Sequence, residues 1–243
     1  MPHPKIFLYF KKFLYNIPAM KKLIINADDF GYRSQINSAI IYAYKNGIVR
    51  STSMLVNRDA FDEAVVLAKE NPGLGIGLHI DLDKYFDIEH GVGNVRRWLN
   101  NNVPAQQVIK DEIKQQIEKL LSAGIQIDHF DSHHHTHLFP NVLPVVVELC
   151  KEYNVNKIRF FNKFGEYEQL KQLLISNNII FPEHFIEGWY YGNVDEDYNI
   201  SEVMTHPGYG EIWRERDLAV CCDKLLMEYC QRNNIDIIKF SDL

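Results

Sequence analysis

Short apolar runs alternate with amphipathic stretches from Lys21 onward, and this alternation constrains the fold more than any other feature of the sequence. The apolar runs predict strands over 23–27, 51–56, 75–82, 125–132, 157–161, 202–205 and 235–240. The amphipathic stretches predict helices over 35–46, 59–70, 106–122, 140–153, 166–176 and 214–232, whereas the aromatic region 181–199 fits neither pattern. Repeated strand–helix units imply parallel strands with right-handed crossovers, so we expect an α/β fold of about seven mostly parallel strands.

Polar residues gather at one end of the predicted strands. Asp28 and Asp29 follow the first strand, His79 lies late in the third, Arg159 lies in the fifth and His206 follows the penultimate one. In (β/α) barrels the reactive residues lie just past the C-terminal ends of the strands. This placement favours a closed or distorted (β/α) barrel over an open doubly wound sheet.

A chain of 243 residues suits one barrel domain, which we place at 20–243. Residues 1–19 are aromatic and basic and are expected to lie outside the fold as an N-terminal extension, with a membrane-surface helix as the alternative. Lys11 and Lys12 interrupt the apolar stretch there, so it is too short for the core of a secretory signal.

Composition excludes several classes of protein. The net charge of −6 argues against a nucleic-acid partner, which would select an excess of basic residues. No apolar run reaches the roughly 18 residues of a membrane span. The four cysteines form no CxxC pair and are expected to be reduced thiols, which predicts a cytoplasmic protein.

Asp28 and Asp29 lie in the segment NADDFG, directly after an apolar strand. Two adjacent buried carboxylates are unfavourable unless a positive charge lies between them or one is protonated, and a divalent cation is the simplest partner. Helix capping near Ser34 would account for one of the two aspartates only.

Histidine is the most informative residue type, because four of the ten histidines fall within 133–137, in the segment DSHHHTH. Neutral imidazoles are good ligands for zinc and similar metals, although a solvated polar loop is the alternative. His79, in GLH, could equally be a core residue. His206 precedes Pro207-Gly208 on a tight turn, and its ordinary pKa near 6.5 suits proton transfer, unless it is a surface turn residue.

Taken together, the segments NADDFG, GLH, DSHHHTHLFP and THPG, in this order and spacing, resemble the YdjC-like carbohydrate deacetylases, which include the chitooligosaccharide (diacetylchitobiose) deacetylases. The resemblance covers about Lys21 to Leu243. It implies a distorted (β/α) barrel and metal-dependent removal of acetyl groups from N-acetylated sugars. It implies one divalent ion, magnesium by resemblance, although a histidine-rich site could take zinc.

The same resemblance implies roles for particular residues. The metal ligands would be Asp29, His79 and His133. Asp28 would be the catalytic base, and His206 the second proton-transfer residue.

Further residues are expected near the substrate. The candidates are Arg159, which could also pair with Asp28 and keep it ionised, and His135, His137, Trp189 and Arg214. Core packing is the alternative for the aromatic residues around Trp189 and for Trp213. For Arg214 and Arg216, solvated helix charges are favoured over contact with a polar or phosphorylated sugar.

The expected activity has two alternatives. One is a metal-dependent hydrolase of another bond, such as a phosphoester, because a fold does not fix the chemistry. The other is a non-catalytic sugar-binding protein. The expected partner is a small acetylated sugar, with a homodimer as a further expectation.

Overall fold

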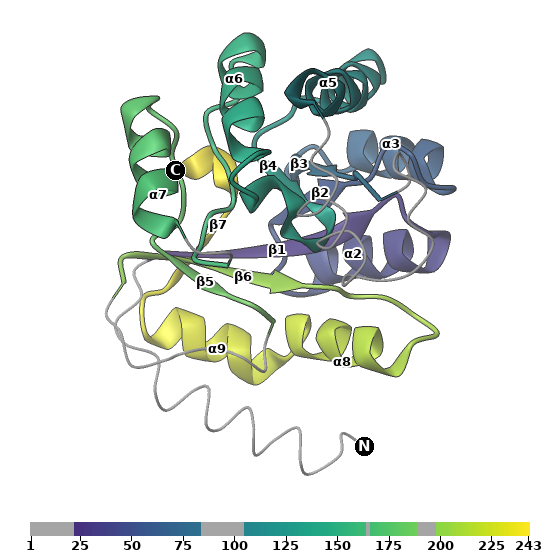
Figure 1. Cartoon of the computed structure of the whole chain (residues 1–243). Coiled ribbons are helices and arrows are strands. Elements are labelled where there is room, and N and C mark those ends of the chain that lie inside the picture. Colours follow the sequence, from purple (N-terminus) through teal and green to yellow (C-terminus); the bar gives the residue numbers. More distant parts are fainter. Residues whose placement is uncertain (1–21, 84–104, 164–165, 189–197) are drawn as a thin grey trace.

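The computed structural model describes residues 22–83, 105–163, 166–188 and 198–243, and Figure 1 gives their arrangement. The predicted extension 1–19 and Trp189 lie outside the described residues. Seven strands of the described part form one sheet with the order β4-β3-β2-β1-β6-β5, and β7 pairs with β1 beside this path. The strands are β1 (Lys22–Phe30), β2 (Ser51–Met54), β3 (Gly75–Ile80), β4 (Phe130–Ser132), β5 (His184–Ile186), β6 (Ile200–Thr205) and β7 (Asp236–Ile238).

Strand pairing in this sheet is parallel throughout, which confirms the prediction of mostly parallel strands. The central strand β1 pairs with β6 along one side. On its other side it pairs first with β7, from Lys22 to Ile24, and then with β2, from Asn26 onward. Because every residue of β1 after Lys22 is buried, the strand forms the centre of the fold.

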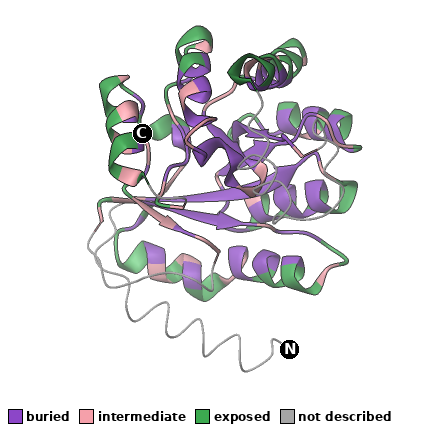
Figure 2. Cartoon of the chain, viewed as in Figure 1, coloured by how far each residue is buried: buried purple, intermediate pink, exposed green. Residues whose placement is uncertain are grey.

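Helices cover the outside of this curved sheet, and their inward faces are buried whereas their outward faces are exposed (Figure 2). They are α2 (Ser34–Asn46), α3 (Phe61–Glu70), α5 (Gln106–Ser122), α6 (Leu143–Tyr153), α7 (Tyr167–Ser176), α8 (Ile212–Cys221) and α9 (Lys224–Arg232). In α5, for example, Ile109, Ile113, Ile117 and Leu120 are fully buried, at the spacing of one helix face.

The side of the barrel between β4 and β5 is irregular. The predicted strand over 157–161 forms only isolated bridges, from Ile158 to Phe130 and from Lys157 to Ile180. The regular ladders therefore make a part-barrel, and single bridges continue it. The fold is α/β and a distorted barrel, as predicted.

Two element predictions were wrong in detail. The predicted strand 125–132 shortens to β4. In the region 181–199, for which the sequence predicts no element, β5 forms. The predicted helix 214–232 is two helices, because Asp223 begins α9 by accepting hydrogen bonds from the backbone N–H groups of Leu225 and Leu226. No helix among the described residues is long and apolar enough to cross a membrane.

Candidate metal and proton-transfer site

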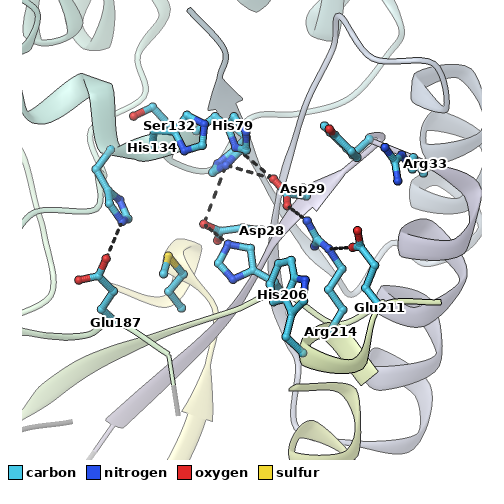
Figure 3. A pocket seen from close by; sticks show the side chains of 15 residues that line it. Asp28, Asp29, Arg33, His79, Ser132, His134, Glu187, His206, Glu211 and Arg214 are labelled. Atoms are coloured by element: carbon cyan, nitrogen blue, oxygen red, sulfur yellow. Dashed lines mark hydrogen bonds and ion pairs between the residues drawn. The ribbon is translucent and has the colours of Figure 1, made fainter. Parts of the chain in front are cut away.

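β1 ends in an irregularity that brings both aspartates to one cavity. Neighbouring side chains in a regular strand point to opposite faces. Between Ala27 and Phe30, however, the register with β2 shifts, and Asp29 has a left-handed backbone with φ of 73°. Such a backbone costs a non-glycine residue about 1–3 kcal/mol. As a result, Asp28 and Asp29 both line the same cavity (Figure 3).

This cavity has a volume of about 430 Å³ and lies at the C-terminal ends of the strands. It brings together side chains from five parts of the chain that are distant in sequence. The predicted site residues that line it are Asp28, Asp29, His79, His133, His135, His206 and Arg214. Arg159 and His137 are not among the lining residues.

His79 is oriented by a buried carboxylate. Its Nδ1 lies 2.8 Å from Asp131 Oδ1, and Ser53 donates to Asp131 Oδ2 at 2.8 Å. This contact directs Nε2 of His79 toward the cavity. A carboxylate behind an imidazole is the usual support of a metal-binding histidine, since it fixes the ring and its tautomer.

Three side chains meet the requirements of a cation site. Asp29 Oδ1 lies 3.3 Å from His133 Nδ1 and 3.6 Å from His79 Nε2. Ligand bonds of about 2.0–2.1 Å in a tetrahedral zinc site separate donor atoms by about 3.3 Å. Asp29 Oδ1 is also buried and makes no well-formed hydrogen bond among the described residues. The donors Asp29, His79 and His133 therefore fit a divalent cation.

The charges around the cavity floor also suit a cation. Asp28, Asp29 and Asp131 are buried carboxylates whose pKa values are lowered, and they lie close to the two buried guanidiniums of Arg159 and Arg214, which leaves one negative charge unbalanced. Glu202 also lies there, but burial raises its pKa to about 7. Burial opposes protonation of His79, but the charges of Asp131 and Asp28 outweigh it and raise its pKa to about 9.

A neighbouring acidic group is less suited to a metal. Asp28, His79 and Asp131 also offer donor atoms close together. The guanidinium of Arg159 already occupies the space between the two carboxylates, because its Nη1 lies 2.7 Å from Asp28 Oδ2 and 3.1 Å from Asp131 Oδ2. A cation there would have to displace this guanidinium.

Asp28 is paired with Arg159, as the sequence suggested. Arg159 is fully buried and donates to both oxygens of Asp28 at 2.7 Å, and its Nε donates to Glu202 Oε1 at 2.7 Å. Burial alone would raise the pKa of Asp28, but Arg159 lowers it, so the carboxyl stays ionised. Arg159 thus acts on the site through Asp28.

His206 lies beside the same carboxylate. Its Nε2 is 3.9 Å from Asp28 Oδ2. Its backbone N–H donates to Asp217 Oδ2 at 2.8 Å, which holds the turn after β6 against α8. Burial lowers the pKa of His206, and the charges of Asp28 and Asp29 oppose this shift.

Arg214 departs from the favoured prediction of a solvated helix charge. It is 6% exposed, and its Nη2 donates to Asp29 Oδ2 at 2.6 Å, while its Nε donates to Glu211. The Trp213 ring lies 4.3 Å from its guanidinium carbon. Arg214 therefore fixes one oxygen of Asp29 and leaves Oδ1 facing the two histidines.

The two remaining histidines predicted near the substrate have different surroundings. His135 lines the cavity beside Glu187, and burial lowers its pKa to about 4. His137 is fully buried, and its ring contacts Ser132 Oγ and the backbone oxygen of Arg159. Its burial lowers its pKa to about 3, so it is a neutral group within the fold.

The buried supports of the site were missed in the sequence. Asp131 orients His79, Glu202 pairs with Arg159, and Asp217 holds His206. Asp131 stands inside the motif DSHHHTH, which was a usable signal. Glu202 in a strand and Asp217 in a helix carry no comparable pattern.

A part-barrel in which a candidate Asp-His-His cation site lies beside an ionised aspartate and a histidine suits a metal-dependent hydrolase. The YdjC-like protein family model matches residues 22–232. Carbohydrate deacetylases of Brevibacillus brevis and Clostridium beijerinckii are each 34% identical, over 91% of this chain and 99% and 100% of their own lengths. The chain therefore belongs to the YdjC-like family.

Solved structures agree on the fold. An Enterococcus faecalis V583 protein nominally assigned to cellobiose-phosphate cleavage has a TM-score of 0.71 and 22% identity, over 92% of this chain and 98% of its own. A mutant of a CE4 family pseudoenzyme with restored activity has a TM-score of 0.50 and 11% identity, over 93% of this chain and 68% of its own.

Proposed function

We propose that this protein hydrolyses the N-acetyl group of an acetylated amino sugar or short chitooligosaccharide and releases acetate. One observation carries the proposal. A carboxylate held ionised by Arg159 lies 3.9 Å from His206 and borders the three candidate metal ligands in a single cavity. The relatives named carbohydrate deacetylases, which align along nearly their whole lengths, support the same reaction.

Asp28 and His206 supply the two proton transfers that amide hydrolysis needs. Asp28 Oδ2 accepts a proton from the attacking water, and Arg159 keeps that oxygen in place. His206 donates a proton to the departing amine, because an amine anion is a very poor leaving group. The carbon–nitrogen bond breaks, and the products are acetate and the free amino sugar.

Asp29, His79 and His133 would hold the divalent cation. When bound, it supplies Lewis acidity that polarises the amide carbonyl and makes water more acidic. We propose magnesium from the family resemblance. Two imidazoles and one carboxylate are also ligands that suit zinc, so zinc is the second candidate.

Side chains at the rim of the cavity are placed to contact a sugar. Trp213 is 48% exposed, lines the cavity and is backed by Arg214, so its free face can stack on a sugar ring. His135 lines the cavity wall, and Trp189 is proposed from the sequence alone.

A cytoplasmic location and a homodimer are further parts of this proposal, testable by cell fractionation and light scattering.

The test is a screen of acetylated monosaccharides and disaccharides with acetate detection, run with magnesium, with zinc and after chelation. We expect acetate from at least one N-acetylated sugar and its loss after chelation. Hydrolysis of a phosphoester without acetate release would favour the phosphoesterase alternative. Binding of sugar and metal without any acetate would favour the sugar-binding alternative.

A further inference from the structure

His133 offers each of its ring nitrogens to a different carboxylate. Nδ1 lies 3.3 Å from Asp29 Oδ1, whereas Nε2 lies 3.9 Å from Asp83 Oδ2. The Nε2 of His134 lies 2.9 Å from the same oxygen of Asp83. We propose that Asp83, His133 and His134 form a second cation site, selective for zinc-like ions, which shares the His133 ring with the first.

The donor atoms of this second group have the separations that a small ion needs. One atom from each side chain lies within 4.8 Å of the others. The separations of 2.9 and 3.9 Å lie on either side of the roughly 3.3 Å expected between tetrahedral zinc ligands. The three side chains are 15–18% exposed, so an ion can reach them from solvent without opening the fold.

The backbone is strained where it presents these histidines. His134 and His135 have left-handed φ values of 57° and 58°, directly after β4. The rings of His133 and His134 lie next to each other after this bend, with centroids 3.9 Å apart and planes tilted by 35°, and both approach Asp83. Strain of about 1–3 kcal/mol per residue persists only where the surroundings impose it, and it is concentrated at functional sites.

The carboxylate of Asp83 is only partly engaged by neighbouring groups. The backbone N–H of Asp83 donates to Asp81 Oδ1 at 3.0 Å, which fixes the turn after β3. Its Oδ1 is buried and makes no hydrogen bond among the described residues. The nearby cation Arg58 is already engaged, since its Nε donates to Asp81 Oδ2 at 2.7 Å. The other oxygen of Asp83, Oδ2, pairs with His134 Nε2 at 2.9 Å, so a bound ion would replace this contact while keeping the same side chains.

The donor set determines which ions bind. Two imidazoles and one carboxylate favour zinc, cobalt or nickel, whereas magnesium prefers oxygen ligands. With both sites filled, His133 would offer Nδ1 to one ion and Nε2 to the other, and the proton of Nε2 would pass to solvent. Ions on the two nitrogens of one imidazole lie about 6 Å apart, beyond the roughly 3.5–4 Å of two-metal phosphoryl-transfer sites. The second site is thus distinct from a two-metal phosphoesterase centre.

The test is metal stoichiometry of the full chain, independent of the reaction catalysed. Chelator-stripped protein is dialysed against zinc or magnesium and analysed by mass spectrometry. We expect two zinc ions per chain for the wild type and one for His134→Gln or Asp83→Asn. Magnesium, which prefers oxygen ligands, should give no more than one ion in each case. His184→Gln removes an imidazole elsewhere and should still bind two zinc ions.

Substitution of a ligand of the first cation site distinguishes failure of the first site from failure of the second. Asp29→Asn should keep one zinc ion, and Asp29→Asn combined with His134→Gln should keep none, with folding of each variant confirmed by circular dichroism. A single zinc ion in the wild type, or two in both His134→Gln and Asp83→Asn, would overturn the second site. If Asp29→Asn leaves the zinc count unchanged, the first site fails instead.

Discussion

Asp28 and Asp29 are neighbours in sequence, but their partners give them different chemistry. Both oxygens of Asp28 accept from Arg159, whereas Asp29 uses one oxygen for Arg214 and turns the other toward two imidazoles. Burial raises the pKa of Asp29, but His133 and the nearby cations lower it well below its usual value. These partners support the proposal that Asp28 moves a proton and that Asp29 binds a cation.

Asp28→Asn tests the role of the base. The amide keeps the size of the side chain but cannot accept the water proton, so we expect kcat for acetate release to fall by about 10²–10⁴-fold. Metal content should stay at the wild-type level. Asp62→Asn, on the exposed side of α3, is the matched control and should keep full activity. Substantial activity in Asp28→Asn would refute its role.

Arg214→Ala tests whether this arginine positions Asp29 for the cation. Loss of the 2.6 Å contact frees the carboxylate to rotate, so we expect metal affinity to fall by about 10–100-fold. Guanidinium at millimolar concentration should restore part of the affinity, measured by calorimetry. The exposed Arg216→Ala should match the wild type. Unchanged affinity in Arg214→Ala would show that Asp29 needs no such support.

Glu202→Gln tests the buried charge behind Arg159. Burial, with help from Asp131 and Asp28, raises the pKa of Glu202 from 4.5 to about 7, although Arg159 opposes it. A raised acid pKa gives stability that is complete below pH 4.5 and is lost as the pH rises through about 7. Glutamine still accepts from Arg159 but does not titrate.

The unfolding free energy of metal-stripped wild type, relative to Glu202→Gln, should therefore decrease between about pH 5 and pH 8. The expected change is about 1–3 kcal/mol, measured by urea titration. Parallel pH curves for the two proteins would mean that Glu202 has an ordinary pKa in the folded state.

At the scale of elements, the periodicity of apolar residues in the sequence predicts the helices and strands that pack one face into the core. The apolar faces of α5 and α6 and the buried strands β1, β2 and β3 all follow the sequence pattern. The bridges at Ile158 and the short strand β5 do not, because each depends on partners distant in sequence. The break before α9 had a local signal in Asp223, a good N-cap residue, but the apolar periodicity runs across it.

Strand ends could be predicted as the location of the site, because parallel strands end at one edge. The orientation of the side chains at these strand ends could not be predicted from the sequence. The left-handed backbones at Asp29, His134 and His135 are imposed by the folded surroundings, since these residue types do not require them. They determine which of the adjacent aspartates and histidines share a site.

Gly77→Ala tests the packing of β3 in the GLH segment. A Cβ at Gly77 would lie 2.2 Å from Cε1 of the His129 ring, which is stacked on Phe240. The ring is fully buried and is held by Phe240 and Asp128, so we expect a loss of about 1–3 kcal/mol in unfolding free energy, measured by urea titration. The loss should shrink in a His129→Ala background. An equal loss in both backgrounds would contradict this contact.

At the scale of the whole molecule, one continuous core joins the sheet to its helices, and it contains three of the four cysteines. None of the four forms a disulfide bond. Burial raises the pKa of Cys150 to about 12 and that of Cys230 to about 11. Because the thiolate is the reactive form, these residues can react only when the fold opens.

Thiol labelling near pH 8 therefore measures how often the molecule opens. We expect at most the half-buried Cys222 to react quickly in the native protein, and all four thiols in denaturant. Cys222→Ser should abolish the fast phase. Rapid labelling of two or more thiols in the native state would contradict a closed core.

The strand pairing of β1 has a consequence for folding of the chain during its synthesis. Both strands that flank its first half, β6 and β7, come from the last part of the chain. At about 5–20 residues per second, a ribosome needs roughly 10–35 s to advance from Lys22 to Ile200. During that time the strand that carries both aspartates has an open edge, so the nascent chain depends on chaperones or on its own helices to shield it.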